Sequence, residues 1–565
     1  MTSENKTCQN CKRDFVIEPE DFDFYARMKV PPPTFCPECR FQRRLMFRNA
    51  MKLYKRACGL CSKNILSWIS TDKPFIVYCS SCYWSDKWDE LSYGREYDPT
   101  RNFFEQYKDF LTSVPWPALS VDYPTLVNSE FVNAAGHLKD CYLIFDADYD
   151  ERSFYSVSIK HCADVMDSYL VSASELCFQN IDSARNNRLF FSEDCEDCHD
   201  VYFSRDMSGC SDCFSCVGLR RKQYNVFNKP YSKEDYFKKL AEFKLSSYSE
   251  LEKIKKEAQA FWLKYPQKYM HSLQNVNSSG EYVYYSKNTR DSYIVVGAED
   301  SRFCQFLGID PIKDSYDYSY WGNNAQNVYE CQDVGEGINS LRFVYGCLGG
   351  FDVEYSMFCW SSQHVFGCAG LGKHSYCIFN KKYSKDDYEK LRARIIEDMN
   401  QNPYTDSKGR VFRYGEFFPY DFSLFAYNET DAQLLFPLSR SEAESMGWHW
   451  REEDSPAYKI TKQAMELPDD IGDAKDDVLK EILGCSSCGR GYRLIPAEVT
   501  LLKSWGFPLP RKCFECRHRE RLSRVNLPHF YSRKCSRCGK EVITSYSPEK
   551  PDILYCEECY NQEVG

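Results

Sequence analysis

Residues 218–236 read GLRRKQYNVFNKPYSKEDY, and residues 370–388 read GLGKHSYCIFNKKYSKDDY. The two stretches match at one constant offset, and Cys216 falls on Cys368 at the same offset. Each stretch closes a longer region of short aromatic runs that polar turn residues separate, a pattern typical of β-strands. The middle of the chain therefore contains two copies of one β-rich region.

The strand candidates share an Asp–x–aromatic–apolar unit and show no helical periodicity. Examples are DCYL at 140–143, DSYL at 167–170, DVYF at 200–203 and DSYI at 291–294. Recurring strands of this kind predict a parallel β-solenoid in two halves, with roughly 20–25 residues per turn. Stacked coils would bring similar side chains together, which suits small cysteines and flat aromatic rings. A β-sandwich or a β-roll is the alternative.

Helical segments follow both halves. Ser232 and Ser384 each precede acidic residues, as a capping hydroxyl does at the start of a helix. A second helix is expected over 249–265, where Ser249 and Glu252 have capping-box spacing. We expect an acidic linker at 466–478.

The two ends of the chain carry cysteines in a second duplication. The first eight and the last eight of the 30 cysteines form CxxC pairs, and the two sets are related by a constant offset of 477. The gaps between successive pairs are therefore identical in the two sets. The paired residues are Cys8, Cys11, Cys36, Cys39, Cys58, Cys61, Cys79 and Cys82, then Cys485, Cys488, Cys513, Cys516, Cys535, Cys538, Cys556 and Cys559.

Two thiolates in a CxxC turn can bind one ion, and a second CxxC completes a tetrahedron. Sixteen thiolates therefore predict about four structural Zn²⁺ sites. We expect neighbouring pairs to share an ion, while an interleaved pairing stays open. Closed sites of this kind leave no position for a substrate.

The stretch 8–44 contains an opening CxxC, a segment ending in FY, a proline-marked turn and CPECR. With these features it resembles zinc-ribbon and treble-clef domains. The stretch from Cys485, which contains CFECR, is a looser version. The resemblance covers only the two ends of the chain and implies zinc binding without a specific activity. The whole layout resembles a bacterial protein type in which paired ribbons flank a cysteine-rich centre.

These patterns predict a mainly β, multidomain chain with paired zinc ribbons at both termini, a duplicated β-solenoid-like core and short helices. The expected domains are tandem ribbons at 1–95, solenoid halves at 96–232 and 276–383, a helical linker at 233–275, a helix with an irregular connector at 384–478, and tandem ribbons at 479–565.

Basic segments lie between the second and third CxxC pairs of each ribbon module. Residues 40–57 hold seven Arg or Lys and no acid, and residues 510–534 hold eight against two acids. Both segments mix aromatic rings with guanidinium groups, a combination that binds phosphates and stacks on unpaired bases. A solvated basic face and a contact for an acidic protein are the alternatives. The candidate nucleic-acid residues are Arg40, Arg43, Arg44, Arg48, Arg517, Arg519, Arg521 and Arg524.

A dense central cluster at 194–216 contains Cys195, Cys198, His199, Cys210, Cys213 and Cys216. It is either a fifth metal site or a row of small side chains inside the solenoid, and the second half lacks its CxxC spacings, which favours the row. Residues 367–374, GCAGLGKH, approach a phosphate-binding loop, but His374 replaces the hydroxyl residue and a strand is expected to follow. Acids such as Asp146, Asp148 and Asp150 are more typical of solvated turns than of a glycosidase.

The composition limits the function. The chain has 565 residues and a net charge of -10, so a nucleic-acid site would have to be a local basic patch on an acidic body. The polar start and the absence of a long apolar run predict a cytoplasmic protein with no membrane contact. We expect a non-enzymatic protein whose ribbons bind nucleic acid, with RNA favoured over specific DNA sites. The alternative is a protein-interaction scaffold that uses the aromatic solenoid surface.

Overall fold

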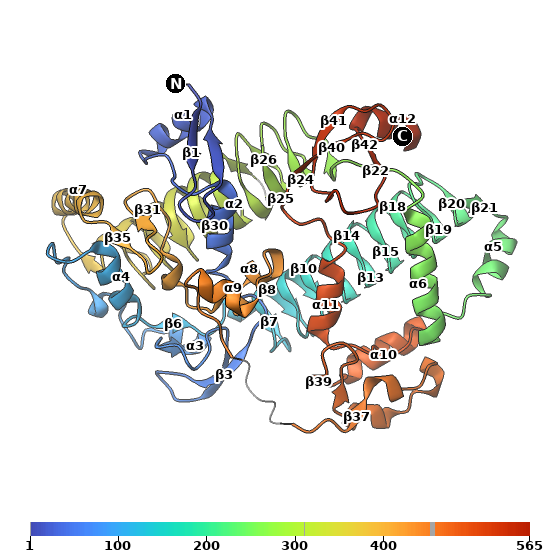
Figure 1. Ribbon diagram of the computed structural model, residues 1–565. Helices are drawn as coiled ribbons and strands as arrows, with labels where there is room; N and C mark the ends of the chain where they lie inside the picture. Colours follow the sequence, from blue (N-terminus) through green and yellow to red (C-terminus); the bar gives the residue numbers. More distant parts are fainter. Residues whose placement is uncertain (1, 310, 453–457, 565) are drawn as a thin grey trace. The chain divides into compact units, whose positions relative to one another are not determined.

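The computed structural model describes residues 2–309, 311–452 and 458–564, and the chain forms two compact units. Unit 1 contains residues 1–119 and 270–451, and unit 2 contains residues 120–269 and 452–565. Each unit therefore combines one ribbon pair with one solenoid half, and the pairing skips the neighbour in sequence (Figure 1). The N-terminal ribbons belong with the second solenoid half, and the C-terminal ribbons belong with the first. The expected mainly β class with a solenoid core is confirmed.

In unit 2, the solenoid strands pair in parallel at a constant register. Val157 in one coil lies beside Phe145 in the preceding coil and Tyr169 in the following coil. The sequence predicted a longer coil, and this prediction is wrong. Equivalent residues of neighbouring coils, such as Ser192 and Ser204, are only 12 residues apart. The strands are β7 (Leu126–Val127), β8 (Asn133–Lys139), β9 (Phe145–Glu151), β10 (Val157–Lys160), β11 (Ala163–Met166), β12 (Tyr169–Ser172), β13 (Glu175–Phe178), β14 (Ile181–Ala184), β15 (Asn187–Phe190), β16 (Glu193–Glu196), β17 (His199–Tyr202), β18 (Arg205–Ser208), β19 (Ser211–Phe214), β20 (Gln223–Val226) and the antiparallel β21 (Lys229–Pro230).

The short coil results from a backbone that turns every third residue. From Ala134 to Phe227, every third residue has a positive φ, between 43° and 67°. Asp and Asn tolerate this left-handed conformation better than most residues. That preference explains why aspartate recurs along the strands, at Asp140, Asp146, Asp164, Asp167, Asp182, Asp194, Asp197, Asp200, Asp206 and Asp212.

From Leu138 to Cys216, the residue after each left-handed position is buried inside the coil, so the interior is filled in columns with one residue from each coil. One column satisfies backbone N–H groups with side-chain oxygens: the N–H of Ser204 donates to Ser192 Oγ at 3.0 Å, and the N–H of Ser192 donates to Asn180 Oδ1 at 3.1 Å. Small polar residues therefore supply hydrogen-bond acceptors for backbone N–H groups at the corners of the coils, where strand pairing supplies none. The column consists of Ser156, Ser168, Asn180, Ser192, Ser204 and Cys216.

The solenoid of unit 1 repeats this architecture with a local expansion. Cys304 bonds to Ser292 of the preceding coil across 12 residues, whereas Ser319 bonds to Gln305 across 14 residues. The strands are β23 (Ser272–Leu273), β24 (Gly280–Tyr284), β25 (Ser292–Val296), β26 (Ala298–Glu299), β27 (Gln305–Ile309), β28 (Ile312–Lys313), β29 (Tyr316–Gly322), β30 (Ala325–Tyr345), β31 (Leu348–Glu354), β32 (Trp360–Phe366), β33 (Ser375–Ile378) and the antiparallel β34 (Lys381–Lys382). The stretch that approaches a phosphate-binding loop joins β32 to β33, so a strand follows it as expected.

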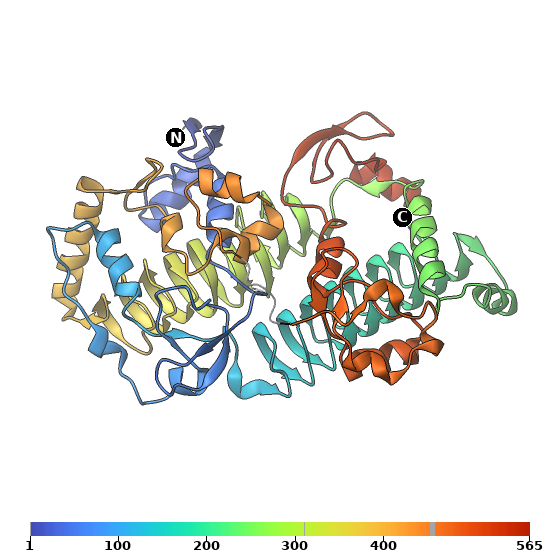
Figure 2. The ribbon, with the colours of Figure 1, turned by 60° about the horizontal axis from the view of Figure 1, so that its bottom comes forward.

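The helices begin close to the predicted residues. Ser232 caps α5 (Lys233–Leu240), and Ser384 caps α7 (Lys385–Gln401). The helix expected from Ser249 starts slightly earlier, because Ser247 caps α6 (Tyr248–Trp262). Figure 2 shows α5 and α6 near one end of the unit 2 solenoid. Among the described residues, no helix combines the length and the apolar character that a membrane span needs.

The ribbons are built from short hairpins and helices. The N-terminal pair contains β1 (Glu4–Thr7), β2 (Asp14–Ile17), α1 (Pro19–Met28), α2 (Pro37–Leu45), β3 (Tyr54–Ala57), β4 (Asn64–Ser67), β5 (Val77–Tyr78) and α3 (Ser80–Tyr83), followed by α4 (Phe103–Leu111) and β6 (Trp116–Pro117). The C-terminal pair contains β38 (Leu483–Gly484), β39 (Gly491–Tyr492), α10 (Pro496–Trp505), α11 (Phe514–Leu522), β40 (Tyr531–Lys534), β41 (Glu541–Thr544), β42 (Leu554–Tyr555) and α12 (Glu557–Val564).

The connector after the second solenoid half is irregular and packed, as expected. It contains β35 (Tyr404–Thr405), β36 (Val411–Phe412), α8 (Asp431–Leu435) and α9 (Arg440–Ser445), and it buries Phe417 and Phe418 completely. Residues 453–457 of this expected region lie outside the described residues. The acidic stretch at 466–478 is not a free linker, because Asp469 accepts a hydrogen bond from the backbone N–H of Ser249 at 2.9 Å and so fixes the start of α6.

Candidate metal centres and the arginine helices

Four groups of four cysteine thiols are the clearest candidate sites in the described part of the chain. Each group joins the turn of a β-hairpin to the first turn of a helix. The sulfur atoms within each group all lie within 4.8 Å of one another. Neighbouring CxxC pairs share a site, as expected, and the pairing is not interleaved. The groups are Cys8, Cys11, Cys36 and Cys39; Cys58, Cys61, Cys79 and Cys82; Cys485, Cys488, Cys513 and Cys516; and Cys535, Cys538, Cys556 and Cys559.

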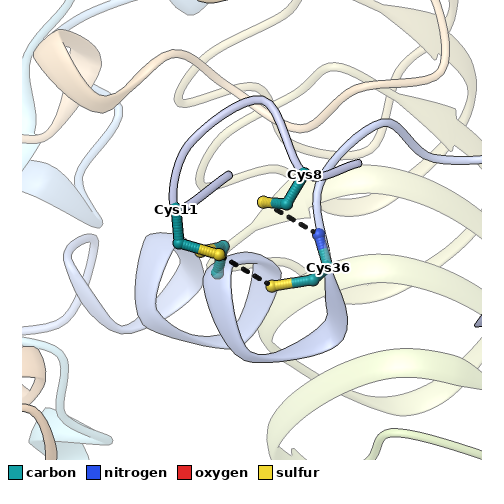
Figure 3. A group of neighbouring side chains, drawn as sticks. Cys8, Cys11 and Cys36 are labelled. Atoms are coloured by element: carbon teal, nitrogen blue, oxygen red, sulfur yellow. Dashed lines mark hydrogen bonds between the residues drawn. The ribbon is translucent and has the colours of Figure 1, made fainter. Parts of the chain in front are cut away.

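The sulfur–sulfur distances match a tetrahedral metal site. A metal–thiolate bond of about 2.3 Å gives a tetrahedron whose edge is about 3.8 Å, because the edge is 1.63 times the bond. Cys11 Sγ lies 3.7 Å from Cys36 Sγ (Figure 3), and Cys488 Sγ lies 3.8 Å from Cys513 Sγ. The residues present therefore fit a four-thiolate metal ion.

Backbone N–H groups stabilise the negative charge that each site needs. The N–H of Cys36 donates to Cys8 Sγ at 3.2 Å (Figure 3), and the N–H of Cys513 donates to Cys485 Sγ at 3.3 Å. Burial raises the pKa of the Cys485 thiol, but backbone donors at Cys488 and Cys513 lower it to about 6. Hydrogen bonds of this kind favour the thiolate, which is the form that binds a metal.

Helix α2, which carries Cys39, also carries arginines that pack onto the unit 1 solenoid. Arg40 Nη2 lies 2.9 Å from Asp317 Oδ2, and Arg44 Nη1 lies 3.1 Å from Asp317 Oδ1. Arg43 Nη2 lies 3.1 Å from Glu330 Oε1. The solenoid carboxylates and the helix arginines are all at most 1% exposed. The pairs therefore form a buried ion network between the ribbon and β29 and β30.

Further contacts extend this network in unit 1. Arg43 also lies 3.3 Å from Glu416, and Arg48 lies 3.1 Å from Asp431 and pairs with Asp333. Burial raises the pKa of Glu330 to about 6, while the nearby arginines oppose that rise. Four buried arginines thus face five carboxylates, namely Asp317, Glu330, Asp333, Glu416 and Asp431.

Unit 2 repeats the central contact with its own residues. The 477 offset relates Arg40 and Arg44 to Arg517 and Arg521 on α11, and both of these pair with one solenoid aspartate, Asp167. Arg521 Nη1 lies 3.1 Å from Asp167 Oδ1. In both units, a single aspartate therefore binds the same two helix positions.

The predicted exposed basic patch is therefore wrong for most of its residues. Arg40, Arg43, Arg44, Arg48, Arg517 and Arg521 are at most 7% exposed. They bind carboxylates because these compensate the charge that burial would otherwise leave unpaired. Arg524 is partly buried and lies 2.6 Å from Glu193. Arg519 is exposed and donates to Cys516 Sγ at 3.5 Å.

The central cysteines form the row of interior side chains, not one of the four metal groups. Cys195, Cys198, Cys210, Cys213 and Cys216 are all buried inside the coils. Their thiols donate to backbone carbonyls: Cys213 Sγ lies 3.3 Å from the carbonyl oxygen of Ser211. His199 points outward, where Nδ1 lies 2.8 Å from Asp200.

Sequence reasoning missed the carboxylates that receive the arginines. Asp167 begins the DSYL unit, and Asp317 begins a similar unit, DYSY at 317–320. The duplicated arginines and the duplicated Asp-containing units were both visible in the sequence. Nothing in the linear pattern joins them, because Arg44 and Asp317 are separated by 273 residues.

The solenoid surface also carries exposed aromatic rings. In unit 2, the ring of Tyr149 stacks on His137 at a centroid distance of 4.1 Å and on His161 at 4.9 Å. Tyr149 is 50% exposed. In unit 1, the ring of His364 stacks on Tyr376 at 5.0 Å. We call the group His137, Tyr149 and His161 the ring ladder.

Fold and sites together define a class: a duplicated protein in which each β-solenoid is bound by a pair of four-cysteine ribbons. No family model, no curated protein and no solved structure matches the chain in the comparisons made with it.

Proposed function

We propose that the protein is a non-catalytic, zinc-stabilised scaffold that binds another protein through the exposed face of its solenoids. The observation that carries the proposal is that most of the ribbon arginines pair with carboxylates inside the protein. They bind the solenoid of their own unit, so the ribbons act as clamps and leave the solenoid surface for a partner.

Zinc is the metal that suits the four sites best. Four thiolates in a tetrahedron favour Zn²⁺ or iron, and Zn²⁺ is typical of structural ribbons. When bound, the ion supplies a cross-link between a hairpin and a helix. A four-thiolate site leaves no position for a substrate, which supports a structural role.

The ring ladder is the part of the surface we assign to recognition. Exposed aromatic side chains are enriched at protein interfaces, because they bury much area at a small entropic cost. A reducing compartment such as the cytoplasm is part of the proposal, because the ribbon cysteines must remain thiolates.

The experiment is affinity purification of the full chain with and without nuclease. We expect a co-purifying protein that resists nuclease and that Tyr149→Ala removes. Tyr123→Ala is the matched control, because Tyr123 is 54% exposed on the same unit outside the ring ladder.

Nuclease-sensitive binding that weakens steeply with salt would contradict the scaffold and support RNA binding instead. The exposed Arg519 would then be the first residue to change.

A further inference from the structure

Unit 2 contains a cleft of about 270 Å³ between α6, the segment 508–512, α11 and the side of the solenoid. Its size approaches the lower end of small-ligand sites, which start at about 300 Å³. Aromatic rings form one part of its wall: Phe178, Phe191, Phe203, Tyr248 and Trp262.

Cations dominate the polar part of the wall. Six cationic side chains line the cleft, and Glu252 and Glu520 are the two acidic residues among its lining residues. Carboxylates pair with most of these cations: Asp167 is shared by two arginines, Glu193 binds a third, and Glu252 and Glu520 bind the two lysines at 2.9 and 2.8 Å. The cations are Lys255, Arg511, Lys512, Arg517, Arg521 and Arg524.

Arg511 is the least compensated of these cations. It is 3% exposed, and its guanidinium donates to two backbone carbonyls, that of Leu467 at 3.0 Å and that of Pro468 at 2.7 Å. Its guanidinium lies 4.8 Å from the centre of the Tyr248 ring. Among the described residues, its Nη1 atom has no hydrogen-bond acceptor. A buried guanidinium in this setting favours an anion beside it.

Unit 1 shows how the corresponding place is filled when the chain supplies its own anion. At the 477 offset, Thr34 and Phe35 correspond to Arg511 and Lys512. Glu416 of the connector accepts a hydrogen bond from the backbone N–H of Thr34 at 2.8 Å and pairs with Arg43. Phe35 is buried. Unit 1 therefore places a connector carboxylate beside the position that Arg511 holds in unit 2.

We propose that this cleft of unit 2 binds a small phosphate-bearing ligand with a planar ring, of the nucleoside phosphate class. The phosphate would contact Arg511, since guanidinium groups are usual phosphate donors, and it would compete with Glu520 for Lys512. The ring would contact the aromatic wall. A free nucleotide and the phosphorylated end of an RNA present the same chemistry.

The test is calorimetric titration of the zinc-loaded full chain with inorganic phosphate, AMP, adenosine and a 5′-phosphorylated oligoribonucleotide. We expect AMP to bind more tightly than phosphate, and adenosine to bind at least tenfold more weakly than AMP. Tighter binding of the oligoribonucleotide than of AMP would identify an RNA end as the source. Tighter binding of AMP would identify a free nucleotide.

Arg511→Gln should weaken AMP binding at least tenfold. Arg537→Gln is the matched control, since Arg537 belongs to the same ribbon pair, pairs with Glu563 and does not line the cleft. If Arg511→Gln fails to fold, Lys512→Gln serves instead, because Lys512 is only partly buried.

No binding of any phosphate compound at millimolar concentration by folded chain would overturn the proposal. Equal affinity of Arg511→Gln and the unchanged chain would also overturn it. The scaffold proposal has a different readout, since it depends on the ring ladder and not on this cleft.

Discussion

Charge at single residues decides how each ribbon meets its solenoid. Arg40 and Arg44 share Asp317, and their counterparts share Asp167. The repeat of these arginines is visible in the sequence, from which we predicted that they bind nucleic acid. The assignment failed because a basic helix looks the same whether its partner is a phosphate or a carboxylate of another segment.

Replacing Arg44 with Met should destabilise unit 1 by about 3–5 kcal/mol, because loss of one partner leaves a buried carboxylate undercompensated. Urea unfolding of the zinc-loaded chain measures this free energy. Arg27→Met is the control: Arg27 pairs with Asp314 at 3.0 Å but is half exposed, so its loss should cost about 0–1 kcal/mol. An unchanged unfolding midpoint for Arg44→Met would argue against the buried network.

Glu498 gives unit 2 a pH dependence. Burial raises its pKa to about 7 from an ordinary 4.5, and Arg517 opposes that rise. The folded state therefore holds this proton more tightly than the unfolded state. The resulting contribution to the stability of unit 2 is complete below pH 4.5 and is lost as pH rises through 7.

The side chain of Glu498→Gln stays neutral at every pH. The free energy of unfolding of this variant should therefore increase relative to that of the unchanged chain between pH 5 and pH 8. The gain should be at most about 3.5 kcal/mol, since the two pKa values differ by about 2.5 and each pKa unit corresponds to about 1.4 kcal/mol. Glu541→Gln, at an exposed residue of the same ribbon pair, should show no such gain. Parallel pH curves for Glu498→Gln and the unchanged chain would contradict the assignment.

At the scale of elements, the backbone conformation of the solenoid repeats every three residues, and a whole coil repeats every twelve. Asp167 lies 27 residues after Asp140 and 33 residues before Asp200, and both separations are multiples of three but not of twelve. Any of the four corners of a coil accepts aspartate, so the spacing of these units does not give the coil length. Helix starts were easier to predict, because a capping serine acts on the first turn that follows it.

Ser192→Val should destabilise the unit 2 solenoid by about 1–3 kcal/mol, because it leaves the buried N–H of Ser204 without its acceptor. Ser192→Cys should cost less, since Cys216 occupies the same column and accepts from the N–H of Asn228 at 3.4 Å. Thermal unfolding of both variants provides the comparison. Equal losses of stability for Ser192→Val and Ser192→Cys would show that side-chain volume, not hydrogen bonding, decides which residue this position accepts.

At the scale of the whole molecule, the four thiolate groups were predicted residue by residue, since a CxxC turn brings its own ligands together. The exchange of ribbons between solenoid halves was not predicted. It depends on contacts between segments that are far apart in the chain, which no local pattern reports.

Metal analysis should find about four zinc ions per chain. Cys36→Ser should lower the count to about three and destabilise unit 1, because the site contributes to folding. Cys213→Ser, inside the solenoid, should leave four. Iron in place of zinc would appear as visible absorbance and would revise the metal, while five ions in the unchanged chain would reopen the central cluster.

The exchange of ribbons also sets an order of events during synthesis. Arg43 is made 287 residues before Glu330, a delay of about 15–60 s at typical elongation rates. Until then, helix α2 has no carboxylates from its solenoid to bind. Unit 2 has the opposite history, since its solenoid is complete before the ribbon helix that binds it is made.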